Sequence, residues 1–297
     1  MSIEIRDVSV RYSVNGKPHK TVINRVSLNI RQGDFVSLVG PSGCGKSTLL
    51  RMIFGSQFPT EGEVRFNGRP VEEINRDRGI VFQKYSVMPN CTVEHSIALG
   101  LELDGGNLTQ RILHTPHFRR VRRSARSEAR ELIAKIGLKP EDGDKYPHEL
   151  SGGMCQRVAI AQALITRPKV LLMDEPFGAL DAGVRKGMQQ MLLKCWQEFG
   201  TTIIFVTHDM EEAVYLGNRV VGLSQLWETP SGEKGTGAVI VSDRAIPGGK
   251  VKPHSFKYEP EFSAILAQIQ HDVLEPEDPL TPDRFIHDHP DSIKSRA

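Results

Sequence analysis

A glycine-rich segment followed by a lysine and a serine is the strongest chemical signal in this chain. Its residues are Gly40, Pro41, Ser42, Gly43, Cys44, Gly45, Lys46, Ser47 and Thr48. The glycines let the backbone bend so that successive N–H groups point at phosphate oxygens, and the lysine ammonium can reach the outer phosphates. In this arrangement the Ser47 hydroxyl is a ligand for Mg²⁺. The segment therefore predicts a site for a magnesium-bound triphosphate.

The residues around this loop have the patterns that its geometry needs. Residues 35–39 are an apolar run of strand length, and residues 46–53 continue the loop as a helix. A strand, a glycine loop and a helix in this order place the positive helix end behind the bound phosphates. A glycine turn beside a solvated lysine is the alternative, and it leaves the two flanking elements unexplained.

Two further groups of residues can act on a phosphate. Ser151, Gly152 and Gly153 offer a hydroxyl, close backbone approach and a helix N-terminus, which together make a second anion-binding turn. The apolar run at residues 170–173 ends in Asp174 and Glu175. A carboxylate at such a strand end can hold Mg²⁺ directly or through water, whereas helix capping is the alternative for the acidic pair.

The hydrophobic pattern predicts one large α/β domain over residues 1–246. Alternating apolar residues before residue 31 indicate an antiparallel β layer, and apolar runs at 170–173 and 202–206 indicate buried parallel strands. Helical periodicity over about residues 92–166 predicts an inserted α-helical subdomain. The predicted fold is a P-loop NTPase core, with a mostly parallel sheet flanked by helices.

A C-terminal extension is predicted over residues 247–297, where proline, glycine, histidine and acidic residues become frequent. Apolar residues at helical spacing predict one amphipathic helix over about residues 261–274. This helix either packs against the core or makes a regulatory contact. The final twenty residues have the composition of a disordered end.

The composition of the 297-residue chain argues against several classes of protein. No window approaches eighteen consecutive apolar residues, and the first residues lack the basic and apolar regions of a secretory signal. A net charge of +2 creates no field that favours nucleic acid, so no nucleic-acid partner is expected. The four cysteines, Cys44, Cys91, Cys155 and Cys195, are widely spaced, which favours a reducing cytosol.

Taken together, these motifs resemble the ATP-hydrolysing subunit of ABC transporters over about residues 1–246. The resemblance implies that residues 40–48 bind ATP and that Ser47, Asp174 and Gln83 hold Mg²⁺. It implies that Glu175 polarises the attacking water. It also implies that Gln83 and His208, each at the end of an apolar strand, respond to the γ-phosphate.

The same resemblance assigns further residues to the nucleotide. Tyr12 lies where the family places an aromatic ring that stacks on adenine, although a strand-end tyrosine is the simpler interpretation. Asp181 matches the loop that crosses the dimer interface in the family, and a helix N-cap role is compatible with it. Ser151, Gly152 and Gly153 would contact the γ-phosphate on a twin subunit, so that two ATP molecules join a head-to-tail pair.

The resemblance also implies partners and a location. It predicts a paired ATPase subunit, transmembrane permease subunits and an indirect link to a solute-binding protein, on the cytoplasmic face of a bacterial inner membrane. The motifs are most similar to ATPases of nitrate, sulfonate and taurine importers. A non-transport ABC-type ATPase of DNA repair, chromosome organisation or translation is the alternative, as is an adaptor that binds ATP without hydrolysing it.

Residues 104–123 are a basic addition to the helical subdomain. They include Gly105, Gly106, Arg111, His114, His117, Arg119, Arg120, Arg122 and Arg123. A solvated loop explains this composition without any function. The alternative is contact with anionic lipid headgroups or with the membrane partner.

Overall fold

The structure is a computed structural model that describes residues 2–14, 17–83, 87–105, 116–249, 252–274 and 280–293. Contacts divide the chain into two compact units. The first unit comprises residues 1–75 and 202–297, and the second unit comprises residues 76–201. The chain therefore leaves the first unit after residue 75 and returns to it at residue 202.

One layer of the first unit is an antiparallel sheet in the strand order β2-β1-β4-β5. Its strands are β1 (Ser2–Val14), β2 (Lys17–Arg31), β4 (Glu61–Phe66) and β5 (Arg69–Pro70). Ile5 of β1 lies opposite Leu28 of β2 and Val64 of β4, and all three side chains are buried. Asn67 and Gly68 both have positive φ angles in the two-residue turn between β4 and β5. The predicted antiparallel layer is confirmed.

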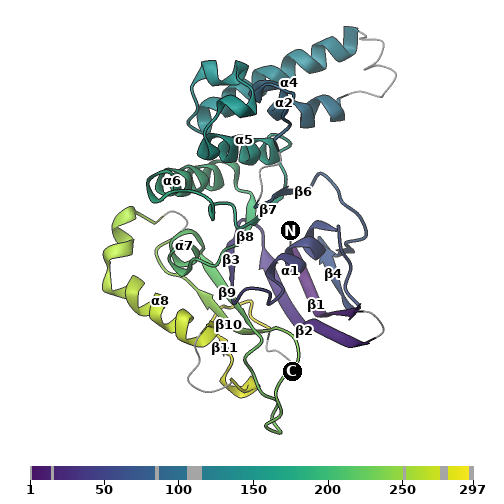
Figure 1. Ribbon diagram of the computed structural model, residues 1–297, viewed down its shortest axis with the longest axis vertical. Helices are drawn as coiled ribbons and strands as arrows, with labels where there is room; N and C mark the ends of the chain where they lie inside the picture. Colours follow the sequence, from purple (N-terminus) through teal and green to yellow (C-terminus); the bar gives the residue numbers. More distant parts are fainter. Residues whose placement is uncertain are drawn as a thin grey trace. The chain divides into compact units, whose positions relative to one another are not determined.

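A second layer of the first unit contains the phosphate loop. Its strands are β3 (Phe35–Val39), β8 (Thr202–Val206), β9 (Arg219–Ser224), β10 (Val239–Ala245) and β11 (Ile286–His287). β3 pairs in parallel with both β8 and β9, whereas β10 runs antiparallel to β9. β3 and β8 are buried along their whole length, as apolar runs in parallel sheets require. The helices are α1 (Lys46–Phe54), α7 (Met210–Leu216) and α8 (Pro260–Val273), with short 3-10 helices η3 (His254–Tyr258) and η4 (Pro282–Arg284) (Figure 1).

The second unit combines two parallel strands with a group of helices. β6 (Arg78–Val81) pairs in parallel with β7 (Val170–Asp174). The helices are α2 (Val93–Asp104), α4 (Pro116–Lys135), α5 (Gly152–Leu164) and α6 (Ala182–Phe199), with 3-10 helices η1 (Pro140–Asp144) and η2 (Pro147–Glu149). The helical character predicted over about residues 92–166 is present in residues 92–105 and 116–166, whereas Gly106, Arg111 and His114 of the basic addition lie outside the described residues. Among the described helices, none has both the length and the apolar character that crossing a membrane requires.

Helix α8 of the C-terminal extension packs against β9, β10 and α7 of the first unit (Figure 1). It buries Phe262, Ile269 and Val273. Gly222 of β9 permits the close approach, because a Cβ atom there would lie 2.3 Å from Cγ2 of Val273. The amphipathic helix predicted over residues 261–274 is present, and its apolar face is occupied by the core.

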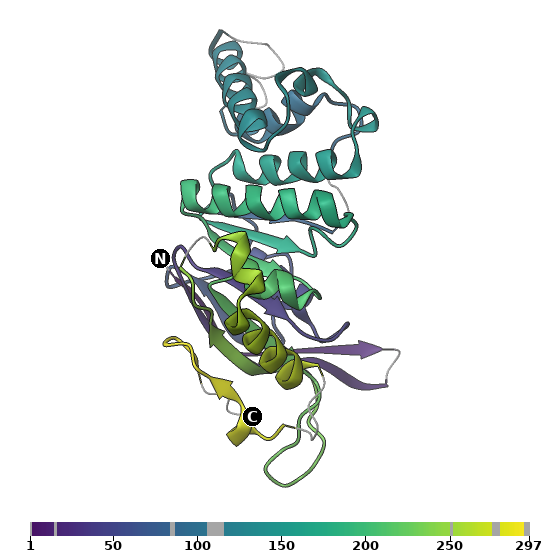
Figure 2. The ribbon, with the colours of Figure 1, turned by 90° about the vertical axis from the view of Figure 1, so that its left-hand side faces the viewer.

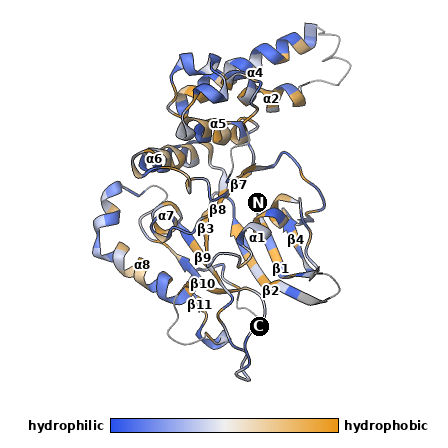
Figure 3. Ribbon diagram, in the orientation of Figure 1, coloured by the Kyte–Doolittle hydropathy of each residue, from blue (hydrophilic) through white to orange (hydrophobic). Residues whose placement is uncertain are grey.

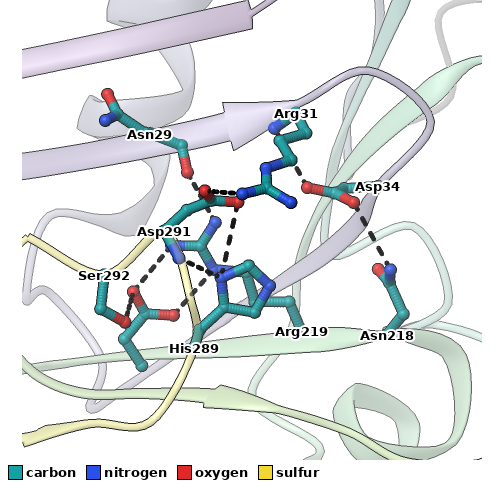
Figure 4. Close-up of polar contacts among 9 residues, drawn as sticks. Asn29, Arg31, Asp34, Asn218, Arg219, His289, Asp291 and Ser292 are labelled. Carbon is teal, nitrogen blue, oxygen red and sulfur yellow. Dashed lines mark hydrogen bonds and ion pairs between the residues drawn. The ribbon is translucent and has the colours of Figure 1, made fainter.

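Residues 280–293 are ordered although their composition indicates disorder, so that prediction is wrong for this segment. This segment contains η4 and β11, and β11 pairs in parallel with β10. The Ser292 hydroxyl donates to the Asp243 carboxylate at 2.6 Å, and the His289 N–H donates to the Asp243 carbonyl oxygen at 3.1 Å (Figure 4). Hydrogen bonds to residues far away in the sequence hold this segment in place, and composition gives no sign of such bonds.

A buried ion pair lies beneath this contact. Arg219 of β9 is fully buried and donates to both carboxylate oxygens of Asp243, each at 2.7 Å. The same guanidinium donates to the carbonyl oxygen of Asn29 at 2.6 Å. Burial, reinforced by the charge of Arg219, lowers the pKa of His289 in the covering segment. Residues 289–292 therefore close over a charge pair of the first unit (Figure 4).

A second buried charge from the extension holds the end of α7. Lys252 is 3% exposed, and its ammonium donates to the carbonyl oxygens of Val214, at 2.7 Å, and of Gly217. The last carbonyl oxygens of a helix have no partner inside the helix, so Lys252 satisfies acceptors that would otherwise be buried without one. The Phe256 ring centroid lies 5.5 Å from Nζ. Burial lowers the pKa of Lys252 to about 7.

We expect Lys252 to make the stability of the protein depend on pH. An ordinary lysine has a pKa of about 10.4, so between this value and that of Lys252 the unfolded chain binds more protons than the folded one. The free energy of unfolding contributed by Lys252 therefore rises with pH across that window. In Lys252→Met the slope should fall by up to about 1.4 kcal/mol per pH unit. Urea unfolding of both proteins at several pH values measures the slopes, and equal slopes would contradict the lowered pKa.

Candidate functional site

The phosphate loop joins β3 to α1 in the order of elements that the sequence predicts. Gly40, Gly43 and Gly45 have positive φ angles of 151°, 78° and 99°. A Cβ atom would lie 2.2 Å from the Leu223 carbonyl oxygen at Gly40, and 2.8 Å from Cγ1 of Ile23 at Gly45. Larger residues at these two positions would clash as well as strain the backbone. Gly45 is the N-cap of α1 and offers no side chain to its first N–H groups, which suits an anion as their partner.

Lys46 is folded back onto its own loop. Its ammonium donates to the carbonyl oxygens of Gly40 at 2.7 Å and of Pro41 at 2.9 Å, and the residue is 6% exposed. To bind a phosphate, the ammonium must exchange these carbonyls for phosphate oxygens, which are charged and stronger acceptors. Ser47 follows in the first turn of α1 and is half-buried. Burial raises the pKa of the Cys44 thiol despite the opposing charge of Lys46, so Cys44 is a neutral packing group.

His208 lies on a turn of the first unit between β8 and α7. Asp209 caps α7 by accepting a hydrogen bond from the Glu212 N–H at 3.1 Å, and its own N–H donates to the Thr207 hydroxyl at 3.0 Å. The Thr207 hydroxyl in turn donates to the Glu212 carboxylate at 3.0 Å. The residues on both sides of His208 are therefore held in place, while the imidazole itself is exposed.

Tyr12 lies near the end of β1 and is 42% exposed. Its hydroxyl accepts a hydrogen bond from the side-chain amide of Gln57. An exposed ring with an anchored hydroxyl can serve as a stacking platform. The same position also agrees with the simpler interpretation of a strand-end tyrosine.

In the second unit, Gln83 and Glu175 meet although 92 residues separate them. Gln83 Nε2 donates to Glu175 Oε2 at 3.2 Å. Asp174 is the last residue of β7 and is half-buried, and Glu175 follows it directly. Glu175 has a φ angle of 47°, in the left-handed region that residues with a Cβ rarely adopt. Strain of this kind is found where the placement of a side chain matters more than local stability.

The Ser151 turn and Asp181 open two neighbouring helices, α5 and α6, which lie side by side (Figure 2). The Ser151 hydroxyl accepts from the Met154 N–H at 3.3 Å, and Asp181 Oδ1 accepts from the Val184 N–H at 2.9 Å. Gly153 is needed for this packing, because a Cβ atom there would lie 2.4 Å from Cγ1 of Val184. A hollow of about 530 Å³ opens beside Ser151 and Gly153. Asp181 therefore has the N-cap role that the sequence left open.

The residues predicted to act on a nucleotide are divided between the two units. The first unit carries Tyr12, Gly40, Pro41, Ser42, Gly43, Cys44, Gly45, Lys46, Ser47, Thr48 and His208. The second unit carries Gln83, Ser151, Gly152, Gly153, Asp174, Glu175 and Asp181. Within the first unit the loop residues 40–48 form one cradle, and within the second unit Gln83 is brought to Glu175.

Two features of the site have no signal in the sequence. The left-handed backbone at Glu175 has no sequence signal, because glycine or asparagine is the usual mark of that conformation. Gln225, just beyond β9, donates to the carbonyl oxygen of Gly43 at 3.5 Å. A single glutamine in a loop carries no local pattern that would connect it with a residue 182 positions away.

The oxygen groups of the predicted metal ligands suit Mg²⁺. The Ser47 hydroxyl, the Asp174 carboxylate and the Gln83 amide carbonyl are hard donors of the kind that this ion prefers. In the part of the chain that the structure describes, no three His, Cys, Asp or Glu side chains gather to hold a metal by themselves. Each unit by itself therefore carries donors of the type that Mg²⁺ takes together with phosphate oxygens and water, Ser47 in the first unit and Gln83 and Asp174 in the second.

Comparison with known proteins places this chain beside transport proteins. The family model described as ABC transporter matches residues 23–178. The taurine import ATP-binding protein TauB of Chromobacterium violaceum is 40% identical over 277 residues, covering 90% of this chain and 94% of TauB. The nitrate import ATP-binding protein NrtC of Synechococcus elongatus is 47% identical over 213 residues, covering 72% of this chain. Only 30% of the length of NrtC is matched.

A solved structure has the same fold. It is the dimeric post-hydrolysis state of an ATP-binding cassette bound to ADP and Pi, and it is 30% identical with a TM-score of 0.66. The match covers 83% of this chain and 99% of that cassette, which confirms the predicted fold class. The TauB match is longer than residues 1–246 can supply, so it runs into the C-terminal extension.

The left-handed backbone of Glu175 predicts that glycine will be a more stable replacement at this position than alanine, the reverse of the order inside a helix. Glu175→Ala and Glu175→Gly both remove the carboxylate, but only glycine adopts the left-handed conformation without a Cβ penalty. We expect the glycine variant to be more stable than the alanine variant by about 1 kcal/mol in denaturant unfolding. Gln190, exposed in the middle of α6, is the control, because alanine should be the more stable replacement there. Equal stabilities of the two Glu175 variants would show that this backbone is not strained.

Proposed function

Because the chain belongs to the ABC transporter family as an ATP-hydrolysing cassette, we propose that it drives the import of a small nitrogen or sulfur compound, such as nitrate, taurine or a related sulfonate. The similarity to TauB carries this proposal, since it extends over nearly the full length of both chains. NrtC supports it with a still higher identity over a shorter match.

In the proposed cycle the first unit binds ATP. The N–H groups of residues 43–48 hold the phosphates, and Lys46 exchanges the carbonyls of Gly40 and Pro41 for phosphate oxygens. Tyr12 offers its exposed ring to adenine. Ser47 would hold Mg²⁺, which, when bound, neutralises the charge that develops on the phosphates.

The second unit supplies the acidic groups for hydrolysis. Glu175 accepts a hydrogen bond from the attacking water and polarises it, a role that needs an ionised carboxylate. Gln83 already donates to this carboxylate, so it can position Glu175, and its amide oxygen and the Asp174 carboxylate would hold Mg²⁺. His208, on its braced turn in the first unit, is assigned to the γ-phosphate.

The working unit is proposed to be a head-to-tail pair of these chains. Ser151 and the glycines after it expose a hydroxyl and a helix N-terminus, which can bind the γ-phosphate of ATP held by the twin. Asp181 lies at the start of the adjacent helix. ATP then favours the closed pair, and hydrolysis removes the phosphate contact and lets the pair open. The dimeric state of the similar cassette supports this assignment.

We assign the chain to the cytoplasmic face of a bacterial inner membrane, where it moves permease subunits and, through them, serves a solute-binding protein. The import functions named for TauB and NrtC support this position. A role in DNA repair, chromosome organisation or translation receives no support from these relatives. Glu175 and His208 likewise favour hydrolysis over the role of an adaptor that only binds ATP.

Glu175→Gln should stop hydrolysis and leave ATP binding intact. The amide has the shape of the carboxylate but cannot act as a base towards water, so turnover should fall at least about 100-fold. With saturating ATP and Mg²⁺, this variant should accumulate as a dimer in size-exclusion chromatography. A Glu175→Gln protein that stays monomeric under these conditions would contradict the proposed pairing.

The matched control for this experiment is Lys46→Ala in the Glu175→Gln background. Loss of the ammonium removes the charged contact to the outer phosphates, so tight ATP binding and the dimer should both disappear. Equilibrium binding of ATP measures the first effect, and the chromatographic profile measures the second. Dimers that form equally well without Lys46 would show that ATP does not hold the pair together.

The solute class is tested in the assembled transporter. The chain is reconstituted in liposomes with its cognate permease and solute-binding protein, and ATP hydrolysis is measured as solutes are added. We expect nitrate or taurine to raise hydrolysis several-fold, because the loaded binding protein favours the closed pair, and an uncharged sugar to have no effect. Stimulation by the sugar and by neither anion would overturn the solute class and leave the ATPase assignment intact.

A further inference from the structure

One face of α4, in the second unit, carries a strongly basic hollow that the nucleotide site does not use. The hollow has a volume of about 570 Å³ and is lined by Glu94, Arg119, Arg122, Arg123, Arg126, Ser127 and Arg130. Figure 3 colours most of α4 as hydrophilic. The apolar face of this helix is already packed, because Phe118, Ala125, Ala129, Leu132 and Ile133 are buried.

Two buried carboxylates form ion pairs with arginines of this hollow, Glu94 from its lining and Glu102 from the same helix, α2. Glu94 and Glu102 are 6% and 5% exposed. Glu94 pairs with Arg130 and Arg126, and Glu102 with Arg122 and Arg126 at 3.8 Å. Three arginines therefore share two negative charges. The five arginines of the hollow exceed the two carboxylates by three positive charges.

The excess charge belongs mainly to Arg119 and Arg123. Both side chains are exposed, and neither forms an ion pair with any residue of the described ranges. Arg119, Arg123, Arg126 and Arg130 recur at intervals of three or four residues, which places them on one side of the helix. At 1.5 Å per residue they form a stripe about 16 Å long.

We propose that this stripe binds the phosphate groups of an anionic phospholipid surface. A guanidinium presents a planar fork of donors that matches two phosphate oxygens, and a row of several guanidinium groups matches the repeated phosphates of a lipid leaflet. The described side chains that line the hollow are all charged or polar. A docked protein segment would need apolar contacts at the centre of its interface, whereas a lipid headgroup needs only charge and hydrogen bonds.

Lipid binding by α4 is a property of this chain alone, so a negative result would leave the proposed import function unaffected. The test therefore uses full-length protein and permease-free vesicles of phosphatidylcholine, with or without phosphatidylglycerol. We expect co-sedimentation with the anionic vesicles only, and binding that weakens as salt is raised, because the attraction is between charges near a surface.

The decisive variant is Arg119→Glu combined with Arg123→Glu, because these two residues have no partner in the described part of the chain to lose. We expect vesicle affinity to fall at least about tenfold, with basal ATP hydrolysis unchanged. Lys234→Glu with Arg284→Glu changes the net charge equally at two exposed positions of the first unit and should leave affinity unaltered.

Four outcomes would overturn the proposal. The first is equal binding to neutral and anionic vesicles, and the second is equal loss of affinity in both double variants. The third is full release of the protein by millimolar inorganic phosphate at constant ionic strength, which would indicate a site for a single soluble phosphate. An acidic peptide that displaces the vesicles at lower concentration than soluble phosphatidylglycerol headgroups would instead indicate a protein partner.

Discussion

The close approach of the phosphate loop to β9 is the constraint on which the rest of the first unit depends. Gly40 lies so near the Leu223 carbonyl oxygen that no side chain fits between them. The loop can keep its shape only if β9 stays in place, between β3 on one side and β10 on the other. Gln225 adds a hydrogen bond from just beyond β9 to the carbonyl oxygen of Gly43. The cradle is therefore shaped by strands that come almost two hundred residues later.

The C-terminal extension stabilises β9 and its neighbours β10 and α7 by direct contacts. Arg219 of β9 and Asp243 of β10 form a buried, bidentate ion pair, and leaving one such charge without its partner typically costs about 3–5 kcal/mol. Ser292 covers Asp243, and α8 packs on Gly222 in the same strand. Lys252 holds the end of α7, the helix that begins beside His208. The extension thus contacts the elements that position both the phosphate loop and this histidine.

The two units present positive charge to anions in different ways. In the phosphate loop, backbone N–H groups and one buried lysine act at a position that the surrounding strands determine, which suits a single triphosphate. On α4, flexible guanidinium groups stand on an exposed helix face above two shared carboxylates, which suits a repeated and less ordered set of charges. The burial and rigidity of the donors distinguish the two sites more than their net charge does.

The sequence by itself determined the features that depend on residues close together along the chain. The loop at residues 40–48, the Ser151 turn and the amphipathic helix α8 all follow from local spacing, because backbone shape and helix periodicity are local properties. Only the tertiary structure decided which distant polar groups meet. The contacts of Gln83 with Glu175 and of Ser292 with Asp243 leave no local pattern, since a polar residue has the same neighbours in sequence whether it is paired or solvated. For this reason the order of residues 280–293 and the excess positive charge on α4 could be seen only in the folded structure.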